Sequence, residues 1–111
     1  MITAVDTNIL LDVLLPSPEF QRSSSAALHR GIQEGRLVVC EMVLAEIGAH
    51  FRAEADLMRF LSETGIRLLP TNDESCFLAG QGWRAYRKSG GPRTRILADF
   101  MVAAHALRQA D

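Results

Sequence analysis

The fold is decided near the start of the chain, by the stretch ITAVDTNILLDVL at residues 2–14. Its first part, residues 2–5, is a short run with β-branched side chains. The polar residues Asp6, Thr7 and Asn8 close that run, which predicts a buried strand ending in a polar turn. Apolar side chains then recur at positions 9, 10, 13 and 14, a spacing that predicts a helix directly after the strand.

Strands and helices are predicted to alternate along the rest of the chain. Further strands are expected at residues 37–40 and 66–69, and further helices at residues 19–34, 43–51, 57–64, 71–86 and 96–107. Such alternation favours an α/β fold with a parallel sheet and right-handed crossovers. Two details are expected as well: a capping box formed by Thr71 and Glu74, and one apolar face on helix 19–34 made by Phe20, Ala27, Leu28 and Ile32.

Length and composition predict one domain over residues 1–111, soluble and cytoplasmic. Apolar residues make up 48% and charged residues 23% of the chain, enough for a hydrophobic core. The net charge of −1 excludes a globally basic nucleic-acid coat. The two cysteines, Cys40 and Cys76, lack the spacing of a disulfide scaffold or a zinc knuckle. No apolar run reaches the roughly 18 residues needed to cross a membrane, and the N-terminus does not resemble a signal peptide.

Three carboxylates stand alone in apolar sequence, and they are the candidates for chemistry. Asp6 follows the first strand, where ligands bind in open parallel sheets. Glu46 lies in the apolar helix that follows the second strand and borders its buried stripe. Asp99 is the one charge in residues 96–104. A buried acid is costly unless it is paired or bound to a metal ion.

Structural roles compete with this interpretation. Asp6 or Thr7 would also suit the N-cap of the following helix. Asp99 would also suit a buried salt bridge to Arg93, Arg95 or a more distant arginine. His50 lies four residues after Glu46, at metal-ligand spacing, although a lone histidine is more often a surface or hydrogen-bonded residue.

The three acids make sense together if the fold gathers them around a divalent cation. Without a cation they would repel one another. Mg²⁺ or Mn²⁺ prefers carboxylate oxygens and water, and such a site can hydrolyse phosphodiesters. Five cations lie within residues 84–95, directly before the Asp99 helix, and would suit a nucleic-acid backbone.

The sequence resembles the PIN-domain ribonucleases, and within them the VapC-type toxins of bacterial toxin–antitoxin pairs. Three blocks carry the resemblance in the expected order: VDTNILL at residues 5–11, VLAEI at 43–47 and RILADFMVAAHA at 95–106. The resemblance implies a three-layer α/β/α fold with a parallel sheet. It also implies that Asp6, Glu46 and Asp99 ligate Mg²⁺ or Mn²⁺, and that Asn8 orients the first acid with Thr7 beside it.

The resemblance implies a function as well: endonucleolytic cleavage of RNA, with Arg93 and Arg95 holding phosphate. It implies a small antitoxin that blocks the cleft, and toxin homodimers or larger assemblies. The rival hypothesis is a PIN-like binding domain that keeps its partner surface and has lost hydrolysis. A receiver-like phospho-acceptor domain fits less well, because Pro70 stands where the acceptor Asp would follow the third strand.

The chain departs from the family pattern at its C-terminus. Family members continue into a further strand and a segment with a fourth acid, whereas this sequence stops at Asp111. We therefore expect a truncated domain that lacks the last strand or strands of a sheet ordered 3-2-1-4-5. The first strand would then have an exposed edge. Asp111 is expected to begin a strand rather than to replace the missing acid.

Overall fold

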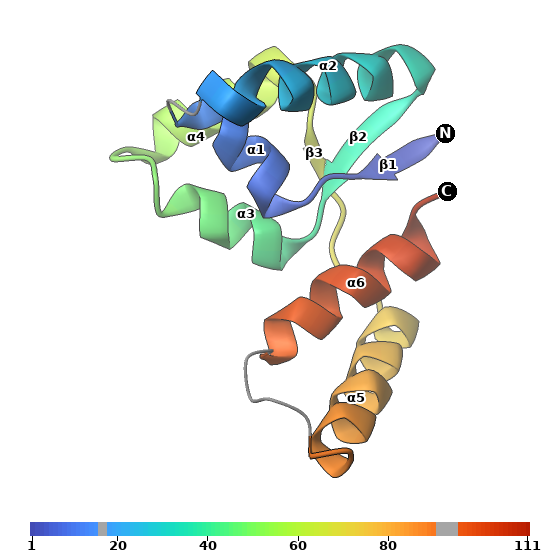
Figure 1. Ribbon diagram of the computed structural model, residues 1–111. Helices are drawn as coiled ribbons and strands as arrows, with labels where there is room; N and C mark the ends of the chain where they lie inside the picture. The colour runs from blue at the N-terminus through green and yellow to red at the C-terminus, as the bar shows by residue number, and fades with distance from the viewer. Residues whose placement is uncertain (16–17, 91–95) are drawn as a thin grey trace.

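The computed structural model describes residues 1–15, 18–90 and 96–111 (Figure 1). Residues 16 and 17 and the phosphate contacts expected at Arg93 and Arg95 lie outside the described residues. The side chains of residues 18–23 and of Ala27 lie outside them too, so the predicted apolar face of helix 19–34 can be compared at Leu28 and Ile32 alone.

Strands and helices alternate as the sequence predicts. The elements in chain order are β1 (Ile2–Ala4), α1 (Thr7–Leu14), α2 (Pro18–Glu34), β2 (Arg36–Val39), α3 (Glu41–Gly48), α4 (Glu54–Thr64), β3 (Arg67–Leu68), α5 (Asp73–Lys88) and α6 (Leu97–Gln109). Among the described helices, none combines the length and apolarity needed to cross a membrane.

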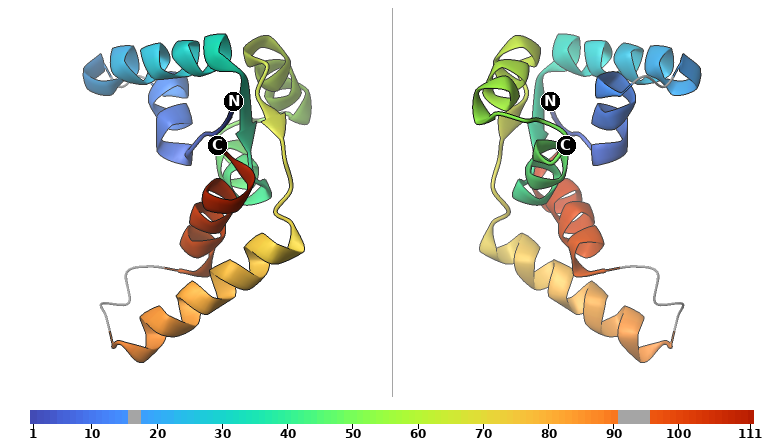
Figure 2. Two further views of the ribbon diagram at one scale, coloured as in Figure 1. Left: turned by 90° about the vertical axis from the view of Figure 1, so that its right-hand side faces the viewer. Right: turned by 90° about the vertical axis from the view of Figure 1, so that its left-hand side faces the viewer.

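The three strands form one parallel sheet in the order β1-β2-β3. Ala4 is in register with Val38, and Val39 with Leu68. The central strand β2 is buried at Leu37, Val38 and Val39, as a strand covered on both faces should be. In the two side views, α1 and α2 lie on one side of the strands and α4 on the other (Figure 2). The predicted α/β fold with a parallel sheet is therefore confirmed, and the strand order matches the 3-2-1 part of the expected sheet.

The core forms where α1 and α3 pack against β2. Its most deeply buried side chains come from these three elements and include Leu10, Val39, Val43 and Ile47. Leu28 packs against this core as predicted, but Ile32 is exposed. The reason is the short distance between α2 and β2. Helix α2 turns Gly31 toward Leu37, where even a Cβ atom would lie 2.5 Å from the leucine, and Ile32 is rotated outward.

Two helix ends bear on the capping expected from the sequence. Gly65 ends α4 in the left-handed region at φ 73°, as predicted from its position. The capping box expected from Thr71 and Glu74 is wrong. Asn72 caps α5 instead, and its side chain accepts a hydrogen bond from the Ser75 N–H. Thr71 is engaged elsewhere: its N–H and hydroxyl both donate to Glu41.

The linker between β3 and α5, residues 69–72, is held from two sides. From α3, the Glu41 carboxylate accepts the N–H of Thr71 at 3.1 Å. From α6, the carbonyl of Leu69 accepts a bond from His105 Nε2 at 2.6 Å, and Gln109 bonds to both Pro70 and Asn72 at 2.9 Å. Because α5 and α6 form a hairpin that follows this linker (Figure 1), these bonds fix where α6 lies relative to the sheet.

We predict that Glu41→Gln weakens the fold at neutral pH and loses its effect in acid. Burial raises the pKa of Glu41, but the hydrogen bonds from Thr71, the backbone hydrogen bond of Glu41 itself and the electrostatic effect of His105 together lower that pKa below its ordinary value of 4.5. The contribution of Glu41 is therefore present above the unfolded-state pKa and disappears as the pH falls through the folded-state pKa.

In urea unfolding at pH 7, we expect Glu41→Gln to lower the free energy of unfolding by about 1–2 kcal/mol. The difference from the unsubstituted chain should shrink below pH 4.5. Glu63→Gln, at an exposed position of α4, is the matched control and should change little. A Glu41→Gln effect that is the same at every pH would contradict the prediction.

Candidate active site

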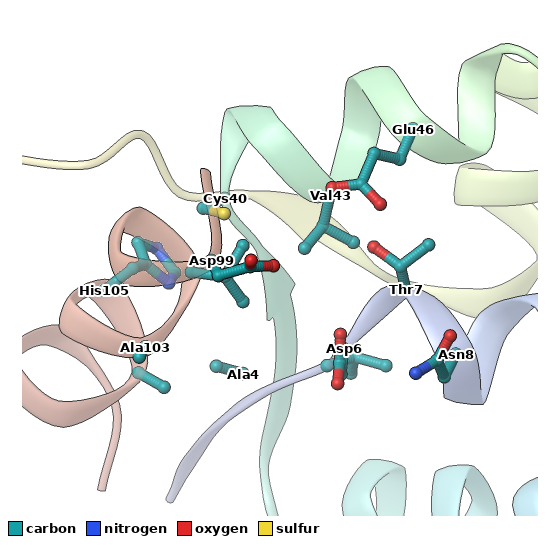
Figure 3. A pocket seen from close by; sticks show the side chains of 13 residues that line it. Ala4, Asp6, Thr7, Asn8, Cys40, Val43, Glu46, Asp99, Ala103 and His105 are labelled. Carbon is teal, nitrogen blue, oxygen red and sulfur yellow. The ribbon is translucent and has the colours of Figure 1, made fainter. Parts of the chain in front are cut away.

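A pocket of about 480 Å³ lies at the carboxyl ends of β1 and β2 (Figure 3). It is bounded by the start of α1, by α3 and by α6. Its lining residues are Ala4, Val5, Asp6, Thr7, Asn8, Cys40, Val43, Glu46, Asp99, Val102, Ala103, His105 and Ala106. Asp6, Glu46 and Asp99, which are far apart in the sequence, therefore border the same cavity.

Asp6 reaches the pocket because β1 ends beside it. It occupies the N-cap position of α1 with extended backbone angles, but its side chain makes no capping hydrogen bond. The alternative prediction, that the Asp6 side chain caps the following helix, is therefore wrong. Its carboxylate is exposed and faces the pocket (Figure 3).

Glu46 is positioned by the buried stripe of α3. Val43 and Ile47 pack into the core, and the helix therefore presents Glu46 to the pocket. Figure 3 shows the Glu46 carboxylate near the Thr7 side chain. Glu46 borders the buried stripe of α3, as the sequence predicts, but its side chain is exposed, so burial does not require it to be paired. The apolar sequence around it belongs to α3, whose other side faces the core.

Asp99 lies in the first turn of α6. One of its oxygens, Oδ2, accepts the N–H of Ile96 at 2.9 Å, which caps the start of the helix and fixes the side chain. The side chain is exposed rather than buried, and two of the arginines predicted as its salt-bridge partners, Arg93 and Arg95, lie outside the described residues. Across residues 1–15, 18–90 and 96–111, no Arg or Lys lies within ion-pair distance of Asp99.

The pocket carries uncompensated negative charge. Three of its lining residues are carboxylates, and none of the described lining residues is Lys or Arg. Acids gathered in this way repel one another unless a cation or a proton joins them. At the same time, within the described part of the chain, no three His, Cys, Asp or Glu side chains are grouped closely enough to hold a metal ion by themselves.

The donor chemistry nevertheless fits Mg²⁺ or Mn²⁺. Mg²⁺ typically takes one or two carboxylates and keeps several water molecules, so it does not need a closed set of protein ligands. Asp6 and Asp99 supply such carboxylate oxygens, and Glu46 borders the same space. Thiolate and imidazole donors suit other metals, and the lining contains one cysteine and one histidine.

Other residues singled out in the sequence divide into two groups. Thr7 and Asn8 line the pocket, with Thr7 buried, but in the described residues neither donates a hydrogen bond to Asp6. His50 is exposed and does not line the pocket. Asp111 also lies outside the pocket, and its N–H donates to the Ile2 carbonyl at 2.9 Å.

His105 is a pocket residue that the sequence did not identify as functional. It is 1% exposed, and its Nε2 bonds to the Leu69 carbonyl. Because a carbonyl oxygen can only accept, Nε2 carries the hydrogen. A polar residue within the apolar stretch 100–107 is the same kind of signal that identified Asp99, and it could have drawn attention to His105.

Comparisons with known proteins agree on the fold. The family model described as PIN domain matches residues 3–111. Among solved structures, the chain is similar to the crystal structure of VapBC2 from Rickettsia felis bound to a DNA fragment from their promoter. The TM-score is 0.72 at 19% identity, over 99% of this chain and 84% of the matched chain. A search of curated proteins gives no match.

We predict that His105→Ala destabilises the chain by about 2–4 kcal/mol. The substitution leaves a cavity and removes the partner of the Leu69 carbonyl. His29→Ala, at an exposed position of α2 where the ring meets Gln33 alone, is the matched control. Thermal unfolding of both variants is the measurement, and equal melting temperatures would show that the His105 contact is dispensable.

Proposed function

The chain belongs to the PIN domain family, and on that premise we propose that it is a Mg²⁺- or Mn²⁺-dependent endoribonuclease of the VapC toxin kind. The observation that carries the proposal is the pocket lined by Asp6, Glu46 and Asp99 without a lysine or arginine among its described residues. Such a pocket attracts a divalent cation, because its described lining supplies no positive charge to balance the acids.

Asp6 and Asp99 are the proposed metal-holding residues, and Glu46 completes the set directly or through water. A hard divalent cation, when bound, lowers the pKa of a water molecule and stabilises negative charge on the departing oxygen of a phosphodiester. The chain's own contribution is to hold these carboxylates still: Asp6 by the end of β1, Glu46 by the packing of α3, and Asp99 by its bond to Ile96.

RNA is the proposed substrate, with Arg93 and Arg95 as phosphate contacts. Both arginines directly precede the helix that carries Asp99 in the sequence. Contacts of this type hold a nucleic-acid backbone and are weakened by salt. They would place a phosphodiester near the carboxylates, and Thr7 and Asn8 would support Asp6.

A small antitoxin that blocks the pocket is the proposed partner, and we propose a homodimer or larger assembly in the cytoplasm. Support comes from the likeness to the VapBC2 structure from Rickettsia felis. In an open pocket, RNA could reach a metal ion held by the acids. A partner that covers Asp6 and Glu46 would keep RNA away from the ion and would stop cleavage.

One observation favours a second candidate, a PIN-like binding domain without hydrolysis. The acids border one pocket, but in the described residues they do not form a ready group of three metal ligands. A domain of this kind would keep the partner surface and bind Mn²⁺ weakly.

We predict that RNA incubated with the protein and Mn²⁺ is cleaved, and that Asp6→Asn lowers the rate by at least about a hundredfold. Asn is the same size as Asp but offers the metal no negative charge. Asp12→Asn is the matched control, because Asp12 bonds to Ser24 and does not line the pocket. Equal cleavage by the unsubstituted chain and Asp6→Asn would reject the nuclease assignment.

Calorimetric titration with Mn²⁺ separates the two candidate functions. A nuclease should bind the ion and show a higher melting temperature in its presence, because an ion that binds the folded state stabilises it. Both effects should be lost in Asp99→Asn. Binding too weak to measure, together with no RNA cleavage, would favour the binding domain.

A further inference from the structure

The C-terminal end of α5 forms a hollow that is separate from the pocket of the carboxylates. Its volume is about 350 Å³, and its lining residues are Trp83, Arg84, Arg87 and Lys88. We call these four residues the α5 cluster. The three cationic side chains are exposed and the tryptophan is half-buried. The hollow therefore combines positive charge with an aromatic ring.

The positive charge of the α5 cluster has no partner in the described part of the chain. None of its three cations forms an ion pair within residues 1–15, 18–90 and 96–111. One reason lies in the sequence, because residues 75–98 contain five arginine or lysine side chains and no aspartate or glutamate. The chain as a whole has a net charge of −1, so this segment is an island of positive charge. Such a concentration of charge attracts anions.

Structural roles account for only part of the cluster. Arg87 and Lys88 lie in the last turn of α5, where positive charge suits the helix dipole. Arg84 lies before that turn, three residues from one of these cations and four from the other. Like charges at these spacings repel one another and destabilise a helix. The fold therefore gives no reason for Arg84, whereas an anion bound among the three side chains would remove the repulsion.

Trp83 prepares the cluster for a flat ligand. Its ring meets Phe100 of α6 in an edge-on contact, with centroids 5.9 Å apart, and this contact holds the indole in place. The Arg87 guanidinium lies over the indole, 5.7 Å from the ring centroid. Nucleobases stack on aromatic rings and on guanidinium planes. A stacked tryptophan and arginine among further cations therefore suit a base together with its phosphates.

We propose that the α5 cluster binds single-stranded RNA beside the segment that enters the carboxylate pocket. Arg84 and Lys88 contact phosphates, and a base stacks on the pair formed by Trp83 and Arg87. Charge and stacking recognise the strand, so the site accepts any base. The choice of RNA as ligand rests on the proposed nuclease function, whereas the site itself rests on the residues of α5.

The cluster lies close enough to the pocket for one strand to occupy both. Helices α5 and α6 pack as a hairpin, so the end of α5 lies near the start of α6 (Figures 1 and 2). Phe100 contacts Trp83, whereas its neighbour Asp99 lines the pocket. The cluster and the pocket are therefore separated by the width of one helix, about 10 Å. A single strand spans this distance with a few nucleotides.

RNA fits the cluster better than an acidic protein segment does. An acidic segment would use the three positive charges alone. The stacked planar groups of Trp83 and Arg87 add a contact that a flat ring system uses fully. The neighbouring pocket favours RNA as well, because RNA is the proposed substrate there. Poly-glutamate serves as the competing ligand in the experiment below.

The experiment uses Trp83 as its own reporter. Because the chain has no other tryptophan, quenching of tryptophan fluorescence reports directly on the cluster. The probe is an oligoadenylate of about ten nucleotides, titrated in EDTA so that neither bound metal nor cleavage contributes. It should quench the fluorescence, and its affinity should fall as salt rises. The slope of log K against log salt should be about −1.4 or steeper, since each phosphate contact on a single strand contributes about −0.7.

Substitutions test the charges, with a matched control. Arg84→Gln and Lys88→Gln should each weaken binding at least about fivefold at low salt and make the salt slope shallower by about 0.7. Arg67→Gln is the control, because Arg67 is an exposed arginine at the start of β3 and lines a different hollow. It should change neither quantity. Arg84→Gln should keep or raise the melting temperature, because it removes like-charge repulsion.

Two further ligands test the stacking. An abasic ribose–phosphate strand of the same length carries the charges without the bases, and it should bind at least about tenfold more weakly. Poly-glutamate should neither quench Trp83 nor displace the oligoadenylate. Equal binding of the abasic strand, or displacement of the oligoadenylate by poly-glutamate at equal charge concentration, would overturn the proposal.

Failure of this proposal can be distinguished from failure of the nuclease proposal. In Mn²⁺ and at low RNA concentration, Arg84→Gln should slow cleavage by the same factor by which it weakens binding. Quenching without cleavage would support the RNA site and reject the nuclease. Cleavage without quenching, or an equal effect of Arg84→Gln and Arg67→Gln on binding, would reject the RNA site and leave the nuclease assignment in place.

Discussion

The position of α6 depends on the hydrogen bonds that hold the linker at residues 69–72. Glu41 binds this linker from α3, and His105 and Gln109 bind it from α6. Strand β3 has two residues, and its pairing with β2 therefore contributes few hydrogen bonds to the position of the hairpin. Without these bonds the α5–α6 hairpin would be attached mainly through one extended segment. Asp99 reaches the same pocket as Asp6 because the linker fixes where its helix lies.

The pocket gathers negative charge from distant parts of the chain. Its carboxylates come from three segments whose neighbouring residues belong to the core or pack against it. The fold supplies no cation among the described lining residues to offset them. The buried stripe of α3 and the capping bond of Asp99 supply the rigidity that the charges by themselves would oppose.

The sequence predicted the parallel sheet and the helices because apolar periodicity reports burial directly, as at residues 37–40. It also identified the acids that meet at one pocket, since Asp6, Glu46 and Asp99 interrupt apolar stretches. The sequence could not predict that these acids are exposed. One face of a helix can be apolar and buried while its other face borders a pocket that is open to solvent. The sequence also could not predict contacts between segments that are far apart along the chain. Thr71 bonds to Glu41 across 30 residues instead of capping the nearest helix.

The α5–α6 hairpin presents two surfaces with different requirements. Toward the pocket, α6 must keep Asp99 fixed, and the packing of Phe100 against Trp83 and Tyr86 helps to hold that helix. Away from the pocket, α5 carries Gly80, where a Cβ atom would meet nothing within 4 Å among the described residues, although glycine inside a helix is less favourable than alanine. The contacts that hold the helix of Asp99 in place therefore lie on the face of α5 that meets α6.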